Sequence, residues 1–330
     1  MKRREFLISA AAAGVVAGTR SVWAQPPVGA KPSTLDRISI MTLNFQRLLK
    51  VPDVQDNPDR TLELFNVAEM IADKYGVHKV EFQHYHIPST EPSYLKELRG
   101  RIEKSKSRMT QINLEFGALN MSAPQQRDRL MAIDLTKMWV DHAVMLGAQR
   151  VMINQGQPTH ENKVYGIPTL KAMADYGRSK GIIVSVETRG GGGGNRGAGG
   201  GAARGAAPGA AAAAPTAAPT PSPAPTGPPP LTGLAAWTLL AEILKGAGSY
   251  SNVDVGGAGA ANQEELHTCL KMLFPMTAGT MHTRVNPRWD LATAIKFLEH
   301  DLGYKGLYTI ESSGGHEGTK EIYDVVVATL

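Results

Sequence analysis

Short apolar, β-prone runs alternate with longer amphipathic stretches along most of the 330-residue chain. The predicted strands are Ile38–Leu43, Lys79–Gln83, Gln111–Phe116, Arg150–Ile153, Ile182–Glu187, Asn252–Val255, Gly279–Thr283 and Leu307–Glu311. The predicted helices are Asp59–Tyr75, Leu95–Arg108, Arg127–Leu146, Pro168–Ser179, Leu231–Gly246, Gln263–Leu273, Asp290–Asp301 and Lys320–Ala328. This alternation indicates a parallel α/β protein, because parallel strands need crossover connections that helices usually supply.

The spacing of the predicted strands favours a closed barrel. Successive strands begin 27 to 41 residues apart, except for one interval of 70 residues between Ile182 and Asn252. That interval contains residues 190–230, which are almost only Gly, Ala, Pro, Ser and Thr and cannot bury enough apolar surface to offset their ordering entropy. When this stretch is subtracted, the interval falls within the range of the other strand spacings. We therefore expect a (β/α)₈ (TIM) barrel over residues 35–330, with a disordered low-complexity insertion after the fifth strand; a doubly wound open sheet is the alternative.

The first 24 residues have the pattern of an export leader. Paired arginines in Lys2-Arg3-Arg4 precede an apolar run from Phe6 to Gly18, and Val22-Trp23-Ala24 resembles a small-residue cleavage signal. The run is shorter than the roughly 20 residues that span a bilayer, so no stable membrane anchor is expected. The sequence predicts a twin-arginine signal peptide, recognition by the twin-arginine export machinery, and a periplasmic or secreted protein.

The charge of the chain argues against a nucleic-acid partner, and its cysteine content excludes an internal disulfide. The leader carries four basic residues and one acidic residue, so it supplies three of the five net positive charges, and the remaining chain is nearly neutral. A nearly neutral chain gives no electrostatic support for a nucleic-acid partner. Cys269 is the single cysteine, which excludes an internal disulfide; we expect it to be a packed core residue.

Four consecutive predicted strands end in groups that can bind a metal ion. These groups are Glu187, Asp254, His282 and Glu311. Active sites of such barrels form at the carboxyl ends of the strands, and neighbouring strands lie about 4.8 Å apart, so the four side chains can converge. Three carboxylates and one imidazole suit one divalent ion, with Mn²⁺ preferred and Mg²⁺, Co²⁺ or Zn²⁺ as alternatives.

Four segments carry a resemblance to a known family. They are Gly181-Ile-Ile-Val-Ser-Val-Glu187, Asn252-Val-Asp254-Val-Gly256, Met281-His282-Thr283 and Gly303-Tyr-Lys-Gly-Leu-Tyr-Thr-Ile-Glu311. In these the chain resembles the xylose isomerase-like TIM barrel superfamily, and within it the sugar phosphate isomerase/epimerase family with its D-tagatose 3-epimerase-like members. The resemblance implies that the four residues above hold one metal ion. It also implies that Glu187 and Glu311 are the catalytic acid/base pair.

The resemblance implies a metal-dependent sugar isomerase or epimerase that abstracts a proton next to a carbonyl through a metal-stabilised enediolate. A lyase or dehydratase acting on a keto-sugar or inosose would use the same intermediate, and a non-catalytic sugar-binding barrel is a further alternative. Endonuclease IV shares the architecture, but its additional metal ligands find no counterpart around Gly257, Ile295 or Phe297. The sequence leaves open the sugar, the stereocentre, the metal and the oligomeric state.

Several other residues are candidates for substrate binding. Ketose epimerases often have a histidine three residues after the strand-six aspartate, but here that position is Gly257. Arg288 stands six residues after His282, where the family has a substrate-binding arginine. His84 and His86 follow the second predicted strand, in the motif that begins at Glu81, and Asn154 follows the fourth. We therefore expect Arg288, His84, His86 and Asn154 to contact the substrate.

Overall fold

The computed structural model describes residues 34–51, 58–117, 119–154, 156, 158–188, 231–257 and 259–330. The chain divides into two units, Met1–Pro32 and Ser33–Leu330, and all described residues lie in the second. The predicted leader at 1–24 and the predicted insertion at 190–230 lie outside the described residues.

Parallel strands form a closed barrel in chain order, which confirms the predicted architecture. The strands are β1 (Ile38–Met41), β2 (Lys79–Gln83), β3 (Arg108–Leu114), β4 (Arg150–Ile153), β5 (Ile183–Glu187), β6 (Tyr250–Asp254), β7 (Thr277–Thr283) and β8 (Leu307–Ile310). Pairing of Ile38 with Tyr308 and of Ile40 with Ile310 joins β1 to β8 and closes the barrel. Closure leaves none of the described strands with an open edge.

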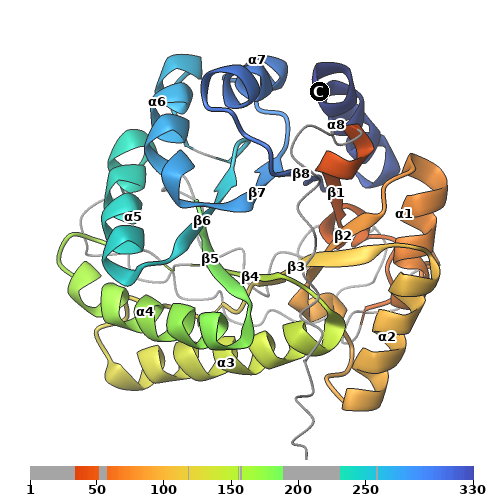
Figure 1. Ribbon diagram of the computed structural model, residues 1–330, viewed down its shortest axis with the longest axis horizontal. Coiled ribbons are helices and arrows are strands. Elements are labelled where there is room, and N and C mark those ends of the chain that lie inside the picture. The colour runs from red at the N-terminus through yellow and green to blue at the C-terminus, as the bar shows by residue number, and fades with distance from the viewer. Residues whose placement is uncertain are drawn as a thin grey trace, which may run out of the picture. The chain divides into compact units, whose positions relative to one another are not determined.

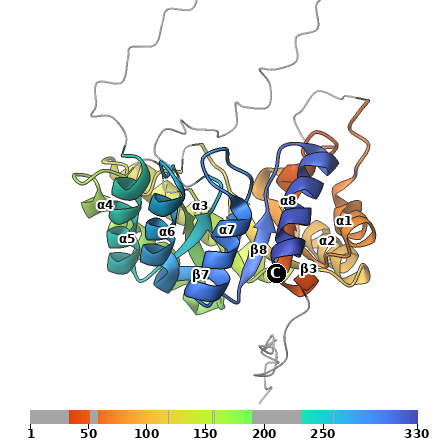
Figure 2. The same ribbon diagram turned by 90° about the horizontal axis from the view of Figure 1, so that it is seen from above.

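Helices surround the strands, as Figure 1 shows in the view into the barrel and Figure 2 from above. They are α1 (Val67–Tyr75), α2 (Pro92–Lys104), α3 (Gln126–Leu146), α4 (Lys163–Lys180), α5 (Gly233–Ala247), α6 (Gln263–Leu273), α7 (Leu291–Lys296) and α8 (Gly315–Thr329). A π-helical turn, Phe297–Asp301, extends α7. Each strand is followed by a helix, so the carboxyl ends of all strands lie at one rim of the barrel.

The apolar periodicity of the sequence explains how these layers pack. The strands are buried on both faces, as a parallel sheet covered by helices requires. The helices bury one face each; in α6 these residues are Leu266, Cys269, Leu270 and Leu273. Cys269 is buried and free, as the sequence predicted. Among the described residues, no helix combines the length and the apolar character needed to cross a membrane.

One helix begins later than its sequence pattern predicted. Helix formation was expected from Asp59, but α1 begins at Val67 after a short 3₁₀ turn, Leu64–Asn66. The backbone of Leu62 exchanges hydrogen bonds with the segment after β1, donating to Leu48 and accepting from Lys50. Because these groups are already used in a bridge, they cannot take part in a helix.

An ion pair fastens the amino-terminal rim of the barrel. Arg37, just before β1, binds the Glu299 carboxylate in a two-pronged contact of 2.6 and 2.7 Å. Tyr308 in β8 donates a further hydrogen bond of 2.7 Å to Glu299. Glu299 therefore links the start of β1 to β8, the first and last strands, where the barrel closes. This link lies at the opposite rim from the carboxyl ends of the strands.

Candidate functional site

The four predicted metal-binding residues all lie at the carboxyl-terminal rim. Glu187 and Asp254 are the last residues of β5 and β6, His282 is the second-last residue of β7, and Glu311 directly follows β8. Asp254 and His282 are register partners, and the backbone of Glu311 donates to Thr283. All four are at least nine-tenths buried. The strand ladder therefore presents them side by side, as their positions in the sequence predicted.

Three of the four side chains meet directly. His282 Nδ1 lies 3.2 Å from Glu187 Oε1 and 3.1 Å from Glu311 Oε2. One ligand atom from each of the three residues lies within 4.8 Å of the others. We call Glu187, His282 and Glu311 the Glu–His–Glu cluster; its spacing allows one cation to reach all three.

Asp254 is next to the cluster but is bound by other groups. Its Oδ2 forms an ion pair with Arg284, and its Oδ1 accepts a 2.7 Å hydrogen bond from the Gly257 backbone. A Cβ atom on Gly257 would lie 1.9 Å from Asp254 Oδ2 and 2.0 Å from Arg284 Nη2. A side chain at this position, where ketose epimerases often have a histidine, would displace the Arg284–Asp254 pair.

Arg284 is the charged residue of the site that sequence reasoning missed. Its guanidinium also lies 3.5 Å from Glu311 Oε1. The signal was available in Met281-His282-Thr283-Arg284, because residues two apart on a strand point to the same face. Arg284 therefore offsets part of the negative charge of Asp254 and Glu311 at the carboxyl-terminal rim.

Burial and neighbouring charges shift the acid–base properties of these residues. Burial raises the pKa of Asp254 to about 6, against the opposing effect of Arg284. Burial also opposes ionisation of Glu311, but Arg284 and His282 outweigh it and hold the pKa of Glu311 below its ordinary value. Burial alone would lower the pKa of His282, yet Glu81, Glu187 and Glu311 raise it well above its ordinary value. The surrounding carboxylates thus favour positive charge at this point.

Glu81 contacts the cluster through the other ring nitrogen of His282. It is a fully buried residue of β2, and its Oε1 lies 2.6 Å from His282 Nε2. The same oxygen accepts hydrogen bonds from Asn113 and Gln111 of β3. In the sequence Glu81 was noted only as part of the motif with His84 and His86. Its contact with His282 is between residues 201 positions apart, so the sequence did not predict it.

His84 and His86 occupy a 3₁₀ turn after β2, and both are buried. His86 Nδ1 lies 2.8 Å from Thr42 Oγ1, and His84 Nδ1 accepts a hydrogen bond from the Glu115 backbone. Burial lowers the pKa of His84 to about 4 and that of His86 to about 3. Both rings are neutral near pH 7, and their role as substrate contacts stays a prediction.

Asn154 and Arg288 have different surroundings. Asn154 follows β4 and donates a hydrogen bond to the carboxylate of Glu115, on the same side of the rim as His84. Arg288 is exposed and its guanidinium lies 5.3 Å from the centre of the Trp289 ring. Neither residue has a described contact with the Glu–His–Glu cluster, so substrate binding by either also stays a prediction.

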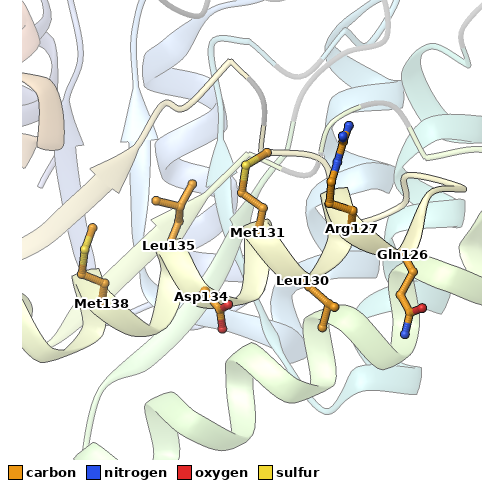
Figure 3. A pocket seen from close by; sticks show the side chains of 7 residues that line it. All are labelled: Gln126, Arg127, Leu130, Met131, Asp134, Leu135 and Met138. Atoms are coloured by element: carbon orange, nitrogen blue, oxygen red, sulfur yellow. The ribbon is translucent and has the colours of Figure 1, made fainter.

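A shallow pocket on the outer surface of α3 is separate from this site. Figure 3 shows the side chains that line it, all from one helix: Gln126, Arg127, Leu130, Met131, Asp134, Leu135 and Met138. It contains none of the rim residues described above.

Comparison with solved structures assigns the fold. No protein-family model matches the sequence, and no curated protein matches it either. A D-psicose 3-epimerase from Clostridium cellulolyticum H10 superposes with a TM-score of 0.60 at 11% identity, covering 88% of this chain and 95% of that one. A xylose isomerase domain protein from Planctomyces limnophilus gives 0.59 at 11% identity over 91% and 98%. A probable 3-DHS dehydratase from Bacillus anthracis gives 0.55 at 11% identity over 89% and 97%.

Proposed function

The chain has the fold of the xylose isomerase-like barrels, and we propose that it is a metal-dependent sugar isomerase or epimerase. The observation that carries this proposal is the Glu–His–Glu cluster at the carboxyl-terminal rim, where barrels of this architecture have their active sites. Two of the similar structures are described as an epimerase and a xylose isomerase domain protein. A small sugar or keto-sugar is the proposed substrate.

The donor atoms of the cluster fit a divalent cation. Two carboxylates and one imidazole are ligands used by Mn²⁺, Co²⁺ and Zn²⁺, and a majority of oxygen donors favours Mn²⁺. Glu311 Oε2 is buried and lies 3.1 Å from His282 Nδ1, so a cation bound to His282 Nδ1 would also reach this oxygen. A bound cation would withdraw electrons from a carbonyl and an adjacent hydroxyl oxygen of the substrate and so acidify the neighbouring C–H bond.

Glu187 and Glu311 are the proposed acid/base pair. Both carboxylates reach His282 Nδ1, yet they come from β5 and β8, so they approach the site from different directions. A carboxylate that removes a proton from one side of a carbon and another that returns one to the opposite side would invert that centre. Return of the proton to the neighbouring carbon would instead interconvert an aldose and a ketose.

Arg284 would assist this chemistry by its charge. Its contact with Glu311 holds that carboxylate ionised and therefore able to accept a proton. Asp254, held in the same ion pair, is the proposed fourth metal ligand, which would require its Oδ2 to exchange Arg284 for the cation.

A lyase or dehydratase is the second candidate, favoured by the similarity to the probable 3-DHS dehydratase. Both candidates begin with the same proton abstraction, and they differ in whether a β-oxygen is then expelled. Incubation of the Mn²⁺-loaded protein with a panel of ketoses, aldoses and 3-keto-sugars, followed by mass spectrometry and NMR, separates them. An epimerase or isomerase gives products of unchanged mass, whereas a dehydratase gives a product lighter by one water; no turnover of any sugar would contradict both.

We also propose that the protein is exported by the twin-arginine route, on the strength of residues 1–24. Amino-terminal sequencing of the protein from a periplasmic fraction is expected to begin near Gln25. Replacement of Arg3 and Arg4 by lysine should keep the protein in the cytoplasm.

A further inference from the structure

Glu81 and His282 form a buried contact between the barrel interior and the Glu–His–Glu cluster. Glu81 Oε1 lies 2.6 Å from His282 Nε2, and both side chains are almost completely shielded from solvent. The other ring nitrogen, Nδ1, is the one that faces Glu187 and Glu311. The imidazole therefore has one carboxylate at Nε2 and two carboxylates at Nδ1.

Two amide side chains hold Glu81 in place. Asn113 Nδ2 donates to Glu81 Oε1 at 2.6 Å, and Gln111 Nε2 donates to the same oxygen at 3.1 Å. Gln111 also donates to Asn113 Oδ1, at 3.0 Å. Donors from β3 and β7 therefore converge on one carboxylate oxygen of β2, and this fixes the carboxylate against the imidazole ring.

A carboxylate at this position determines which nitrogen of His282 carries the ring proton. An ionised carboxylate only accepts hydrogen bonds, so the nitrogen that faces it must be the protonated one. In a neutral imidazole the other nitrogen then presents its lone pair. Glu187 and Glu311 favour a proton on Nδ1 as well, and a cation bound between them would replace that proton. Glu81 then favours the ring form with the proton on Nε2 and the lone pair of Nδ1 directed at the cation.

We infer that Glu81 is a positioning residue that orients His282 and selects its metal-binding form. The inference rests on the proposed metal site and adds to it a residue from β2, a strand that contributes nothing to the predicted ligand set. Carboxylates that accept the second N–H of a metal-binding histidine raise its basicity, and their loss commonly weakens metal binding 10- to 100-fold. Glu81 itself touches neither substrate nor metal in this account.

The test compares the Mn²⁺ affinity of three glutamate variants with that of the unmodified chain. Glu81→Gln keeps the size of the side chain but replaces the accepting carboxylate by an amide. Glu81→Asp keeps the charge but withdraws it from His282 Nε2 by one methylene. Glu299→Gln is the matched control, since it neutralises a largely buried carboxylate at the opposite rim without touching His282. Titration calorimetry gives the Kd, and circular dichroism establishes that each variant is folded.

We expect both Glu81 variants to bind Mn²⁺ about 10- to 100-fold more weakly than the unmodified chain, and Glu299→Gln to bind within about twofold of it. A second measurement uses ¹⁵N-labelled His in the Zn²⁺-loaded protein, with His282→Asn to assign the signal. The unmodified ring should show its proton on Nε2 with the downfield ¹H shift of a hydrogen bond to a carboxylate, and Glu81→Gln should move this ¹H signal upfield.

Two results would overturn the inference, and they differ in meaning. If the unmodified chain binds Mn²⁺ and a folded Glu81→Gln or Glu81→Asp binds it equally well, Glu81 is only a packing residue and the proposed function stands. If the unmodified chain binds no Mn²⁺, the proposed metal site fails and the role of Glu81 fails with it.

Discussion

Arg284 and Asp254 form an ion pair beside the Glu–His–Glu cluster. The guanidinium places a positive charge next to a site that is proposed to attract a cation. At an effective dielectric constant of about 20, a unit charge several ångströms away opposes cation binding by on the order of 2 kcal/mol. Because the Arg284 side chain is 32% exposed, solvent and salt screen part of this effect.

Replacement of Arg284 by glutamine should therefore tighten Mn²⁺ binding about tenfold, as measured by calorimetric titration. Arg288→Gln removes the same charge from an exposed position in the following loop and should change the Kd less than twofold. An Arg284→Gln variant that binds Mn²⁺ more weakly would show instead that the arginine is needed to hold Asp254.

Neutralisation of either proposed acid/base residue should remove catalysis without unfolding the barrel. Glu187→Gln and Glu311→Gln are each expected to lower kcat/KM by about 10²- to 10⁴-fold, because positioned proton transfer contributes that much to rate. Mn²⁺ affinity should also fall, since each residue loses a charged ligand oxygen. The control is Glu97→Gln, an exposed residue of α2 paired with Arg101. Full activity of either rim variant at saturating Mn²⁺ would exclude that residue from the mechanism.

His86 predicts a pH dependence of stability. The pKa of His86 is lowered to about 3 in the folded chain, so as pH falls below its ordinary value of 6.5 the unfolded chain takes up the proton first. The stability contributed by neutral His86 is therefore present above about pH 6.5 and is lost as pH falls toward 3, by at most about 1.4 kcal/mol per pH unit.

Urea unfolding between pH 7.5 and 5 tests this dependence. The free energy of unfolding of the unmodified chain should approach that of His86→Gln as pH falls. His78→Gln, which alters an exposed histidine, is the matched control for loss of an imidazole. A constant difference for His86→Gln would mean that the histidine is solvated in the folded state.

The ion pair at the amino-terminal rim should matter for stability and not for function. Arg37→Met leaves the largely buried Glu299 carboxylate without its main partner, and loss of one member of such a pair costs up to about 3 kcal/mol. Lys305→Met removes an exposed cation 3.5 Å from the same carboxylate and should cost less than about 1 kcal/mol. Mn²⁺ affinity should be unchanged in both; similar melting temperatures for the two variants would contradict the assignment.

The strand ends could be predicted from sequence because burial of a parallel strand leaves an apolar run that stops at a polar residue. Glu187 and Glu311 stand at such stops, and the barrel brings them together as expected. The partners of these residues depend on side-chain direction and on strands distant in sequence. Glu81 meets His282 across 201 positions, and no local pattern encodes that contact.

The partner of Asp254 also could not be predicted from sequence, although Arg284 is close to it in the structure. Its position beside His282 followed from the strand pattern, but its ion pair with Arg284 depends on the missing side chains of Gly256 and Gly257. In the sequence Gly257 stood out only as the position where a family histidine is missing, and the packing of Arg284 against both glycines shows why a larger residue would not fit.

Crystals of the protein soaked in MnCl₂ and measured at the manganese absorption edge test the central claim most directly. The account predicts one strong anomalous peak at the carboxyl-terminal rim, bonded by Glu187, His282 Nδ1 and Glu311. A fully loaded crystal with no peak there, or with manganese bound only elsewhere, would contradict it.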